Sequence, residues 1–366
     1  MPVLRPALLA TFLIAAATSQ GPGRAMPKRT EIADGVFLFQ TEPYGDAGLD
    51  GNAVAIVSDG GVVMFDANGT PEAARAVIAS LRQVTAQPVK YLVLSHWHWD
   101  HWYGVKSYVE AFPGIHVVAQ ERTRTLMAGP ALEFNEPGLA DQFPAHIKAI
   151  EAAATKAKAS GGADTTIARL EAHAAFDTWF LAQKREGGHA LPDLTFRDTL
   201  TLTVGPRVVQ VWSPGHAITP GDAMLWLPAD RVAIVGDLLI NPITFGLFSY
   251  PKGWIAALDH IDSLDARVIV GGHGEPMRDA SLLRDTRALL EREYAIAADM
   301  KRSGKPWADA KAAVLADSAS LALRARITGG VAARNDAFSL YLVEWVVKRM
   351  YGEIDGTLGD SIPKGP

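Results

Sequence analysis

Short apolar runs separated by turns open the chain and predict strands. Three runs, at residues 35–40, 52–57 and 61–66, have the length and composition of strands. The Asp59-Gly60 pair between the last two runs predicts a hairpin. A helix is expected from Thr70 to about residue 84 with Pro71 at its first position, and a buried strand follows at residues 89–94.

The pattern then changes from alternating runs to helical spacing. A helix at residues 105–112 and a strand at 115–119 precede an Ala-rich insert that covers about residues 121–190. Two helices are expected inside the insert, at residues 139–158 and 164–184. Because this insert separates two groups of polar candidates in the sequence, it could cap a site.

The second half of the chain repeats the order of strands followed by helix and strand. A helix is predicted at residues 254–264, and a helical C-terminal extension begins at about Asp279, with helices at 280–300, 307–323 and 335–351. Further strands are predicted at residues 194–196, 200–204, 207–212, 223–227, 232–235 and 268–270. Strands followed twice by alternating strand and helix predict an α/β fold in the form of a layered sandwich.

The first 19 residues have the form of a secretory signal peptide. Arg5 supplies a positive charge, and the apolar stretch at residues 7–17 is too short to span a bilayer comfortably. A Gly- and Pro-containing linker, residues 20–29, would connect it to the domain. We therefore expect an exported, periplasmic protein with no stable membrane insertion; an uncleaved anchor is the alternative.

Composition narrows the possible partners and ligands. The 366 residues are 48% hydrophobic and carry a net charge of −5 without long runs of one sign, so we expect no nucleic-acid partner. The length allows one large domain or two smaller ones. The chain has no cysteine, which leaves any metal ion to histidine, aspartate and glutamate.

Four side chains that can bind metal follow the strand at residues 89–94. They are His96, His98, Asp100 and His101, all within six residues. Imidazole together with carboxylate suits zinc and related metals. His96 and His98 are two residues apart and can converge on one ion, while Asp100 and His101 could face a second.

Three further candidates each follow a predicted strand and each have a glycine neighbour. They are His216 after the strand ending at Trp212, Asp237 after residues 232–235, and His273 after residues 268–270. Taken singly, each is a weak signal. Together with the first cluster they place an acid or an imidazole at the carboxyl end of four strands.

With these residues the sequence resembles the metallo-β-lactamase fold superfamily of hydrolases over residues 30–278. The resemblance implies an αββα four-layer sandwich with two metal ions at one edge. It further implies that Asp237 bridges both ions, that His96, His98 and His216 bind the first, and that Asp100, His101 and His273 bind the second.

Two divalent ions that share a water lower its pKa and supply hydroxide near neutral pH. Asp100 could orient this nucleophile and carry a proton to the leaving group. We therefore expect a dinuclear zinc hydrolase, with iron or manganese possible, that cleaves an ester, lactone, thioester or amide bond of a small molecule. The alternatives are a mononuclear iron persulfide dioxygenase, and β-lactam hydrolysis as a side or main activity.

Departures from the family pattern bear on the substrate. An aspartate at position 237 differs from the Cys or Ser usual in β-lactamases proper. Trp102 and Tyr103 replace small residues of many relatives and suggest an aromatic wall, so they are candidate substrate-binding residues together with Asn241. His116, which is flanked by aliphatic residues, is expected to be a core histidine, and His260 a structural one. Three histidines of the insert are expected at its surface, namely His146, His173 and His189. Whether the C-terminal extension packs on the sandwich, completes the pocket or forms a homo-oligomer contact is left open.

Overall fold

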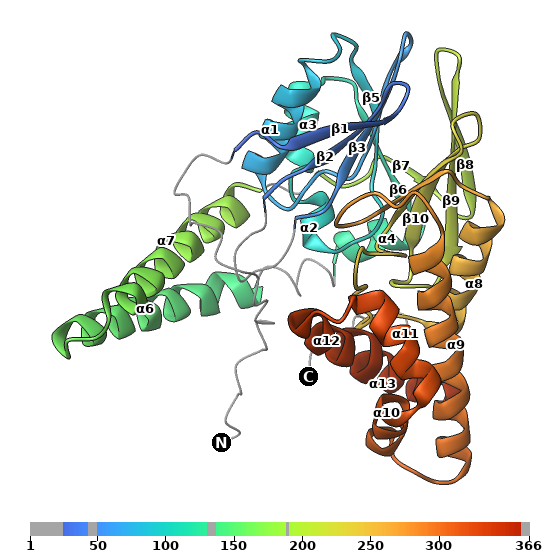
Figure 1. The fold of residues 1–366 in the computed structure, drawn as a ribbon. Coiled ribbons are helices and arrows are strands. Elements are labelled where there is room, and N and C mark those ends of the chain that lie inside the picture. Colours follow the sequence, from blue (N-terminus) through green and yellow to red (C-terminus); the bar gives the residue numbers. More distant parts are fainter. Residues whose placement is uncertain (1–24, 43–49, 130–136, 188–189, 360–366) are drawn as a thin grey trace.

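Two β-sheets lie face to face in the computed structural model, and helices cover their outer faces (Figure 1). The structure describes residues 25–42, 50–129, 137–187 and 190–359. The predicted signal segment and most of the predicted linker lie outside these residues. The four-layer α/β sandwich expected from the sequence is confirmed.

The first sheet has seven strands that neighbour one another in chain order. Pairing is antiparallel from β1 to β4 and parallel from β4 to β7. The strands are β1 (Lys28–Ala33), β2 (Val36–Gln40), β3 (Ala53–Ser58), β4 (Gly61–Phe65), β5 (Val89–Val93), β6 (His116–Gln120) and β7 (Leu194–Phe196). Its connecting helices are α1 (Pro71–Leu81), α2 (Trp99–Trp102), α3 (Val105–Ala111) and α4 (Glu121–Met127).

The second sheet has five strands in the order β12-β11-β10-β9-β8. Only β11 and β12 pair in parallel, with helix α8 (Pro251–Ser263) as their connection. The strands are β8 (Thr199–Val204), β9 (Arg207–Gly215), β10 (Asp222–Leu227), β11 (Val232–Gly236) and β12 (Val268–Gly271). Both sheets thus end in parallel strands, whose carboxyl ends lie at one edge of the sandwich.

Alternation along the strands divides the core into layers. On β3, Val54 and Ile56 pack between the sheets, whereas Ala53 and Ala55 face the helices outside the first sheet. Successive strand side chains point to opposite faces, so a strand covered on both sides is apolar at nearly every position. The frame that carries the strand ends is therefore buried on both faces.

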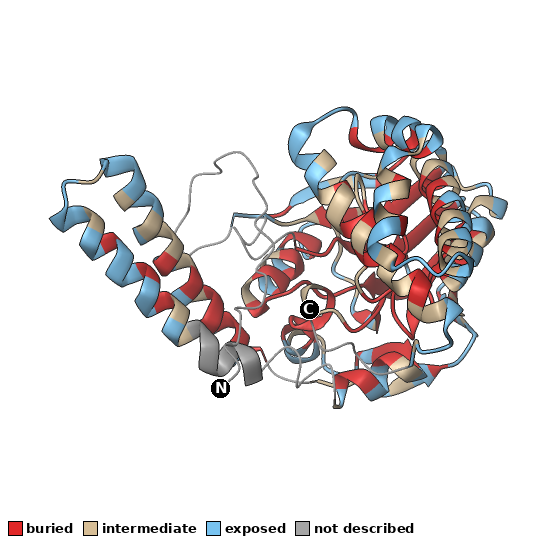
Figure 2. Cartoon of the chain, turned by 90° about the horizontal axis from the view of Figure 1, so that it is seen from below, coloured by how far each residue is buried: buried red, intermediate tan, exposed pale blue. Residues whose placement is uncertain are grey.

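The insert forms a helical hairpin, here called the arm, made of α6 (Pro137–Ala159) and α7 (Asp164–Glu186). The arm projects from the sandwich, and its tip is mostly exposed while buried residues gather toward its base (Figure 2). Ile147, Phe180 and Leu181 form a small apolar cluster between its helices. At the base, Trp179 Nε1 donates a hydrogen bond to Glu72 Oε2 of α1 at 2.8 Å.

The C-terminal extension packs on the second sheet through α8. One continuous apolar cluster joins Trp254 and Ile261 of α8 to the helices of the extension. These are α9 (Ser281–Arg302), α10 (Trp307–Ala316), α11 (Ser318–Thr328), the π-helical segment η2 (Phe338–Glu344) and α13 (Trp345–Ile354). The short helix α12 (Ala332–Ala337) precedes η2 and has no buried residue. Within the described residues, no helix has the length and apolar character needed to cross a membrane.

The observed elements include the short helices α2 and α4, which were not predicted, and they differ from the predicted ones at two further places. Strand β1 starts inside the segment predicted as a linker, because four of its six residues are polar and it lies at the sheet edge. The helix predicted at 307–323 is two helices. Asp317 between them is extended, and its side chain accepts a hydrogen bond from Ser320 N, so it caps the second helix.

Candidate metal centre

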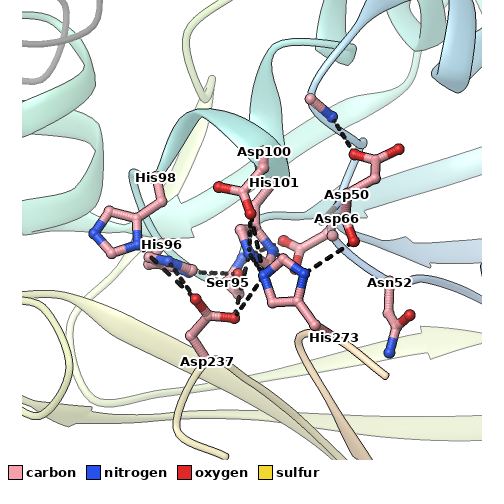
Figure 3. A network of polar contacts seen from close by, with 12 residues as sticks. Asp50, Asn52, Asp66, Ser95, His96, His98, Asp100, His101, Asp237 and His273 are labelled. Carbon is pink, nitrogen blue, oxygen red and sulfur yellow. Dashed lines mark hydrogen bonds and ion pairs between the residues drawn. The ribbon is translucent and has the colours of Figure 1, made fainter. Parts of the chain in front are cut away.

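The loop after β5 carries four of the predicted site residues into one place. Ser95 N donates a hydrogen bond to Asp66 Oδ1 at 2.7 Å, which holds the loop against the end of β4. His96 and His98 precede the short helix α2, and Asp100 and His101 lie on it. This one turn of helix carries Asp100 and His101 to the same group of ligand atoms (Figure 3).

The parallel strands β11 and β12 carry two more of the predicted ligands. Asp237 directly follows β11 and His273 lies two residues beyond β12. Gly272 between them has to be a glycine, because a Cβ there would lie 1.9 Å from Asp237 Oδ1. Side chains that are 36 residues apart in the sequence therefore meet at the sheet edge.

Asp237 faces both halves of the cluster, one carboxylate oxygen to each. Its Oδ2 lies 3.5 Å from His96 Nε2 and 3.9 Å from His98 Nδ1. Its Oδ1 lies 3.3 Å from His101 Nε2 and 3.5 Å from His273 Nε2. A carboxylate in this position can bridge two ions.

The distances between donor atoms are on average shorter among Asp100, His101 and His273 than between Asp237 and the first two histidines. His273 Nε2 lies 3.1 Å from Asp100 Oδ2 and 3.3 Å from His101 Nε2. Asp100 Oδ2 lies 3.5 Å from His101 Nε2. Together with Asp237 these atoms surround one point, and we call the six residues the centre: His96, His98, Asp100, His101, Asp237 and His273.

Each of three imidazoles is held by a second contact on its other nitrogen. His101 Nδ1 lies 2.8 Å from the buried Asp66 Oδ2, and His96 Nδ1 lies 2.8 Å from Ser95 Oγ. His273 Nδ1 donates to the backbone oxygen of Asp50 at 2.9 Å. Such contacts fix the tautomer and the ring orientation, leaving Nε2 directed at the cluster.

The sequence reasoning missed Asp66, Ser95 and Asp50. Asp66 has a left-handed backbone with φ 61° and is fully buried at the end of β4. A polar residue that ends a wholly apolar strand was the available signal. It did not separate Asp66 from an ordinary turn residue.

Burial and neighbouring charge act in opposite directions on the pKa values of the centre. Burial alone would raise the pKa of Asp237, but the imidazoles around it, His101 foremost, hold that pKa well below its usual value. Burial alone would lower the pKa of His101, but Asp100 and Asp237 hold it well above its usual value. The pKa of His96 is lowered by burial and by the neighbouring imidazoles. Because metal ligands bind in their deprotonated form and the pKa of His101 is raised, ion binding would release protons.

The donor set fits divalent metal. His96 Nε2 is buried and finds no hydrogen-bond partner within the described part of the chain. Buried polar atoms are nearly always satisfied, so this nitrogen is accounted for by an ion at the position it faces. Imidazoles with carboxylates are ligands for zinc, iron and manganese.

His216 lies outside the centre. The structure brings together six of the seven predicted ligands, but His216 is exposed and its ring packs against Tyr250, with centroids 4.5 Å apart. A hollow beside it is lined by Tyr250 and by Glu353, Gly356 and Leu358 of the C-terminal extension. Its role as a ligand of the first ion stays a prediction.

The placement of Trp102 and Tyr103 does not fit the expected aromatic wall. Trp102 is 0% and Tyr103 1% exposed, and both belong to the core outside the first sheet. Trp102 Nε1 donates to the backbone oxygen of Trp97 at 2.8 Å. The α2 turn points these rings inward, so they support the metal loop and offer no surface to a substrate.

Lys184 of the arm joins this aromatic layer. Its Nζ lies 3.5 Å from the centroid of the Trp99 ring and 3.7 Å from that of Tyr103. Cation–π contacts are strongest where water is excluded, and Lys184 is 7% exposed. The base of the arm is therefore packed directly against the loop that carries the centre.

Asn241 has a structural role in the loop after β11. Its Nδ2 donates to the backbone oxygen of Glu275 at 3.0 Å, and its own backbone nitrogen donates to His273 O. The side-chain amide thus braces the loop that carries His273. This is the turn-forming role that an Asn-Pro pair commonly has.

The remaining histidines match their expected positions only in part. The prediction of a core position for His116 is wrong, because this first residue of β6 is exposed and its ring pairs with the exposed Asp193 at 2.8 Å. His260 packs on Trp212. His189 lies outside the described residues. His146 and His173 of the arm, expected at its surface, come together with a buried aspartate.

Comparisons with known proteins agree with this geometry. The family model of the metallo-beta-lactamase superfamily matches residues 46–273. A linear primary-alkylsulfatase from Pseudomonas sp. strain ATCC 19151 is 27% identical over 240 residues, which cover 59% of this chain and 40% of that one. The chain thus spans less than half the length of this relative.

Solved structures show the same fold. A variant of the sec-alkyl sulfatase PisA1 matches with a TM-score of 0.59 at 15% identity, over 90% of this chain and 50% of that one. A metallo-beta-lactamase from Pontibacter korlensis matches with a TM-score of 0.51 at 20% identity, over 72% of this chain and 99% of that one. With the family model covering most of the sandwich and the centre's His and Asp residues in place, the chain belongs to the metallo-beta-lactamase superfamily.

Proposed function

We propose that the protein is a dinuclear zinc hydrolase that cleaves an ester bond of a small molecule. The observation that carries this proposal is the position of Asp237, with one oxygen toward His96 and His98 and the other toward His101 and His273. A mononuclear site needs no carboxylate shared in this way. The geometry therefore favours two ions over a single iron.

The side chains of the centre would hold the two ions and the substrate's reacting atoms in place. When bound, a zinc pair lowers the pKa of a water between the ions and stabilises negative charge on the substrate oxygen. Asp100 is the more accessible carboxylate, with its side chain 14% exposed against 4% for Asp237. It is thus the group able to orient the attacking water and pass a proton to the leaving group.

The name of the curated relative suggests a first substrate class. That relative is a linear primary-alkylsulfatase, so an alkyl sulfate is the ester to test first, followed by carboxylic esters, lactones, thioesters and amides. Sulfate and acyl esters share the need for a nucleophile and for charge stabilisation on oxygen. The centre supplies groups for both.

A substrate panel on the zinc-loaded protein tests the proposal. We expect about two zinc ions per chain and hydrolysis of at least one ester class, lost on chelation and restored by zinc. One iron per chain with oxygen uptake on a persulfide would contradict it. Hydrolysis of β-lactams and of no ester would agree with a zinc pair but contradict the proposed ester substrate.

Export is a separate proposal, based on the apolar segment at residues 7–17. A periplasmic protein would lose this segment. Sequencing of the mature amino terminus tests this, and a retained Met1 would refute cleavage. The mass of the protein in solution, measured on the same preparation, tests whether copies of the chain associate.

A further inference from the structure

We propose that the arm carries a second metal site, for a single zinc ion, formed by His146 of α6 and by His173 and Asp177 of α7. The site shares no residue with the centre. It would link the two helices of the arm.

The distances between the donor atoms fit coordination of one ion. Asp177 Oδ2 lies 3.6 Å from His146 Nε2 and 3.5 Å from His173 Nε2, and the three atoms all lie within 4.8 Å of one another. Donors about 2.1 Å from a tetrahedral zinc lie about 3.4 Å apart. Both separations exceed the range of about 2.7–3.2 Å typical of a hydrogen bond.

The local sequence explains why these donors converge. His173 and Asp177 are four residues apart on α7, so they lie one above the other on one face of the helix. His146 comes from the antiparallel helix α6, next to Ile147 of the small apolar cluster. The ring centroids of the two histidines are 5.9 Å apart.

Burial separates the roles of the three groups. The Asp177 side chain is 7% exposed, whereas His146 and His173 are 39% and 31% exposed. The carboxylate therefore lies on the inner side of the cluster, and the two imidazoles lie toward the solvent. The exposed side of the imidazoles lets an ion enter and leaves a fourth position for water, as zinc commonly has with three protein ligands.

The arm is a place where such an ion would matter. Its own apolar cluster is made of Ile147, Phe180 and Leu181, a small core for two helices of 23 residues each. An ion held by both helices would fix their spacing and stabilise the hairpin. Because Lys184 at the base contacts Trp99 and Tyr103, a more ordered arm would also steady the loop of the centre.

Metal counting on the full chain tests the site. Protein stripped with a chelator is loaded with zinc chloride, freed of excess zinc by gel filtration and analysed for zinc per chain. We expect wild type to keep one zinc more than His173→Gln or Asp177→Asn. Glu171→Gln is the matched control, since Glu171 lies on the same helix and pairs with Lys158 at the surface. This control should keep the wild-type count.

Amide hydrogen exchange gives a second readout that does not depend on activity. Zinc should slow exchange in α6 and α7 of wild type and of Glu171→Gln, but not of His173→Gln. Equal zinc counts in wild type, His173→Gln and Asp177→Asn would overturn the site. So would an extra zinc that gel filtration removes from every form. If no ester is hydrolysed while the arm still binds zinc, the result would contradict the proposed function and leave the arm site supported.

Discussion

Two clusters of histidine and aspartate lie in this molecule on different kinds of support. The centre sits at the ends of strands buried on both faces, and His96, His101 and His273 are each braced on the second ring nitrogen. The arm cluster stands on two helices with a small shared core. The comparison indicates that similar ligands serve different purposes on different supports. A rigid frame of strands holds metal ions in fixed positions, whereas a helical hairpin is itself made more rigid by the ion that it binds.

The largest effect is expected from removing the bridging carboxylate. Asp237→Ala should lose both ions of the centre and lower kcat/KM by about 10⁴-fold or more, on the scale of deleting an essential catalytic group. The arm zinc should remain in this variant. Unchanged zinc and activity in Asp237→Ala would reject the bridge.

Two single-histidine variants test the first half of the centre. His98 Nδ1 lies 3.9 Å from Asp237 Oδ2, while the His216 ring packs on Tyr250. We therefore expect His98→Ala to lose more zinc and more activity than His216→Ala. Equal losses would show that His216 turns toward the first ion, as the family resemblance implies.

A smaller effect is expected from the brace behind His101. Asp66→Asn keeps the size of the side chain and tolerates the left-handed backbone, with φ 61°, but removes the charge that faces His101 Nδ1. Loss of such a contact typically costs about 10–100-fold in metal affinity. A competing chelator titration would measure it, and an unchanged affinity would show that the brace is dispensable.

The smallest effect on activity is expected at Glu293, whose carboxyl group is buried on α9. It is 0% exposed on α9, both carboxylate oxygens find no hydrogen-bond partner within the described residues, and burial raises its pKa well above 4.5. Because the folded state holds this proton more tightly than the unfolded chain, stability is full below about pH 4.5 and falls as pH rises, by up to about 1.4 kcal/mol per pH unit.

Glu293→Gln removes this titration. The variant should have a higher melting temperature than wild type at pH 8, with a smaller difference at pH 5 and unchanged activity at 25 °C. Melting curves at the two pH values measure it. A difference that grows toward low pH would mean that the carboxylate is ionised in the folded state.

Much of the fold and the location of the centre could be predicted because both depend on local pattern. The alternating and continuous apolar runs mark the strands, and His96 to His101, Asp237 and His273 each follow a strand end. The braces could not be predicted, because Asp66 and Asp50 are single residues whose partners are set by strand pairing. The burial of Trp102 and Tyr103 depends on the α2 turn, which is too short to leave a periodic signal. The arm cluster joins His146 to Asp177 across two helices, so spacing alone could not reveal it.

The central claim is tested most directly by a crystal structure of the zinc-loaded protein with anomalous data at the zinc absorption edge. We expect two peaks at the centre, one on each side of Asp237, with its two oxygens directed at different ions. A single peak there, or a signal at the iron edge in protein purified without added metal, would contradict a dinuclear zinc hydrolase.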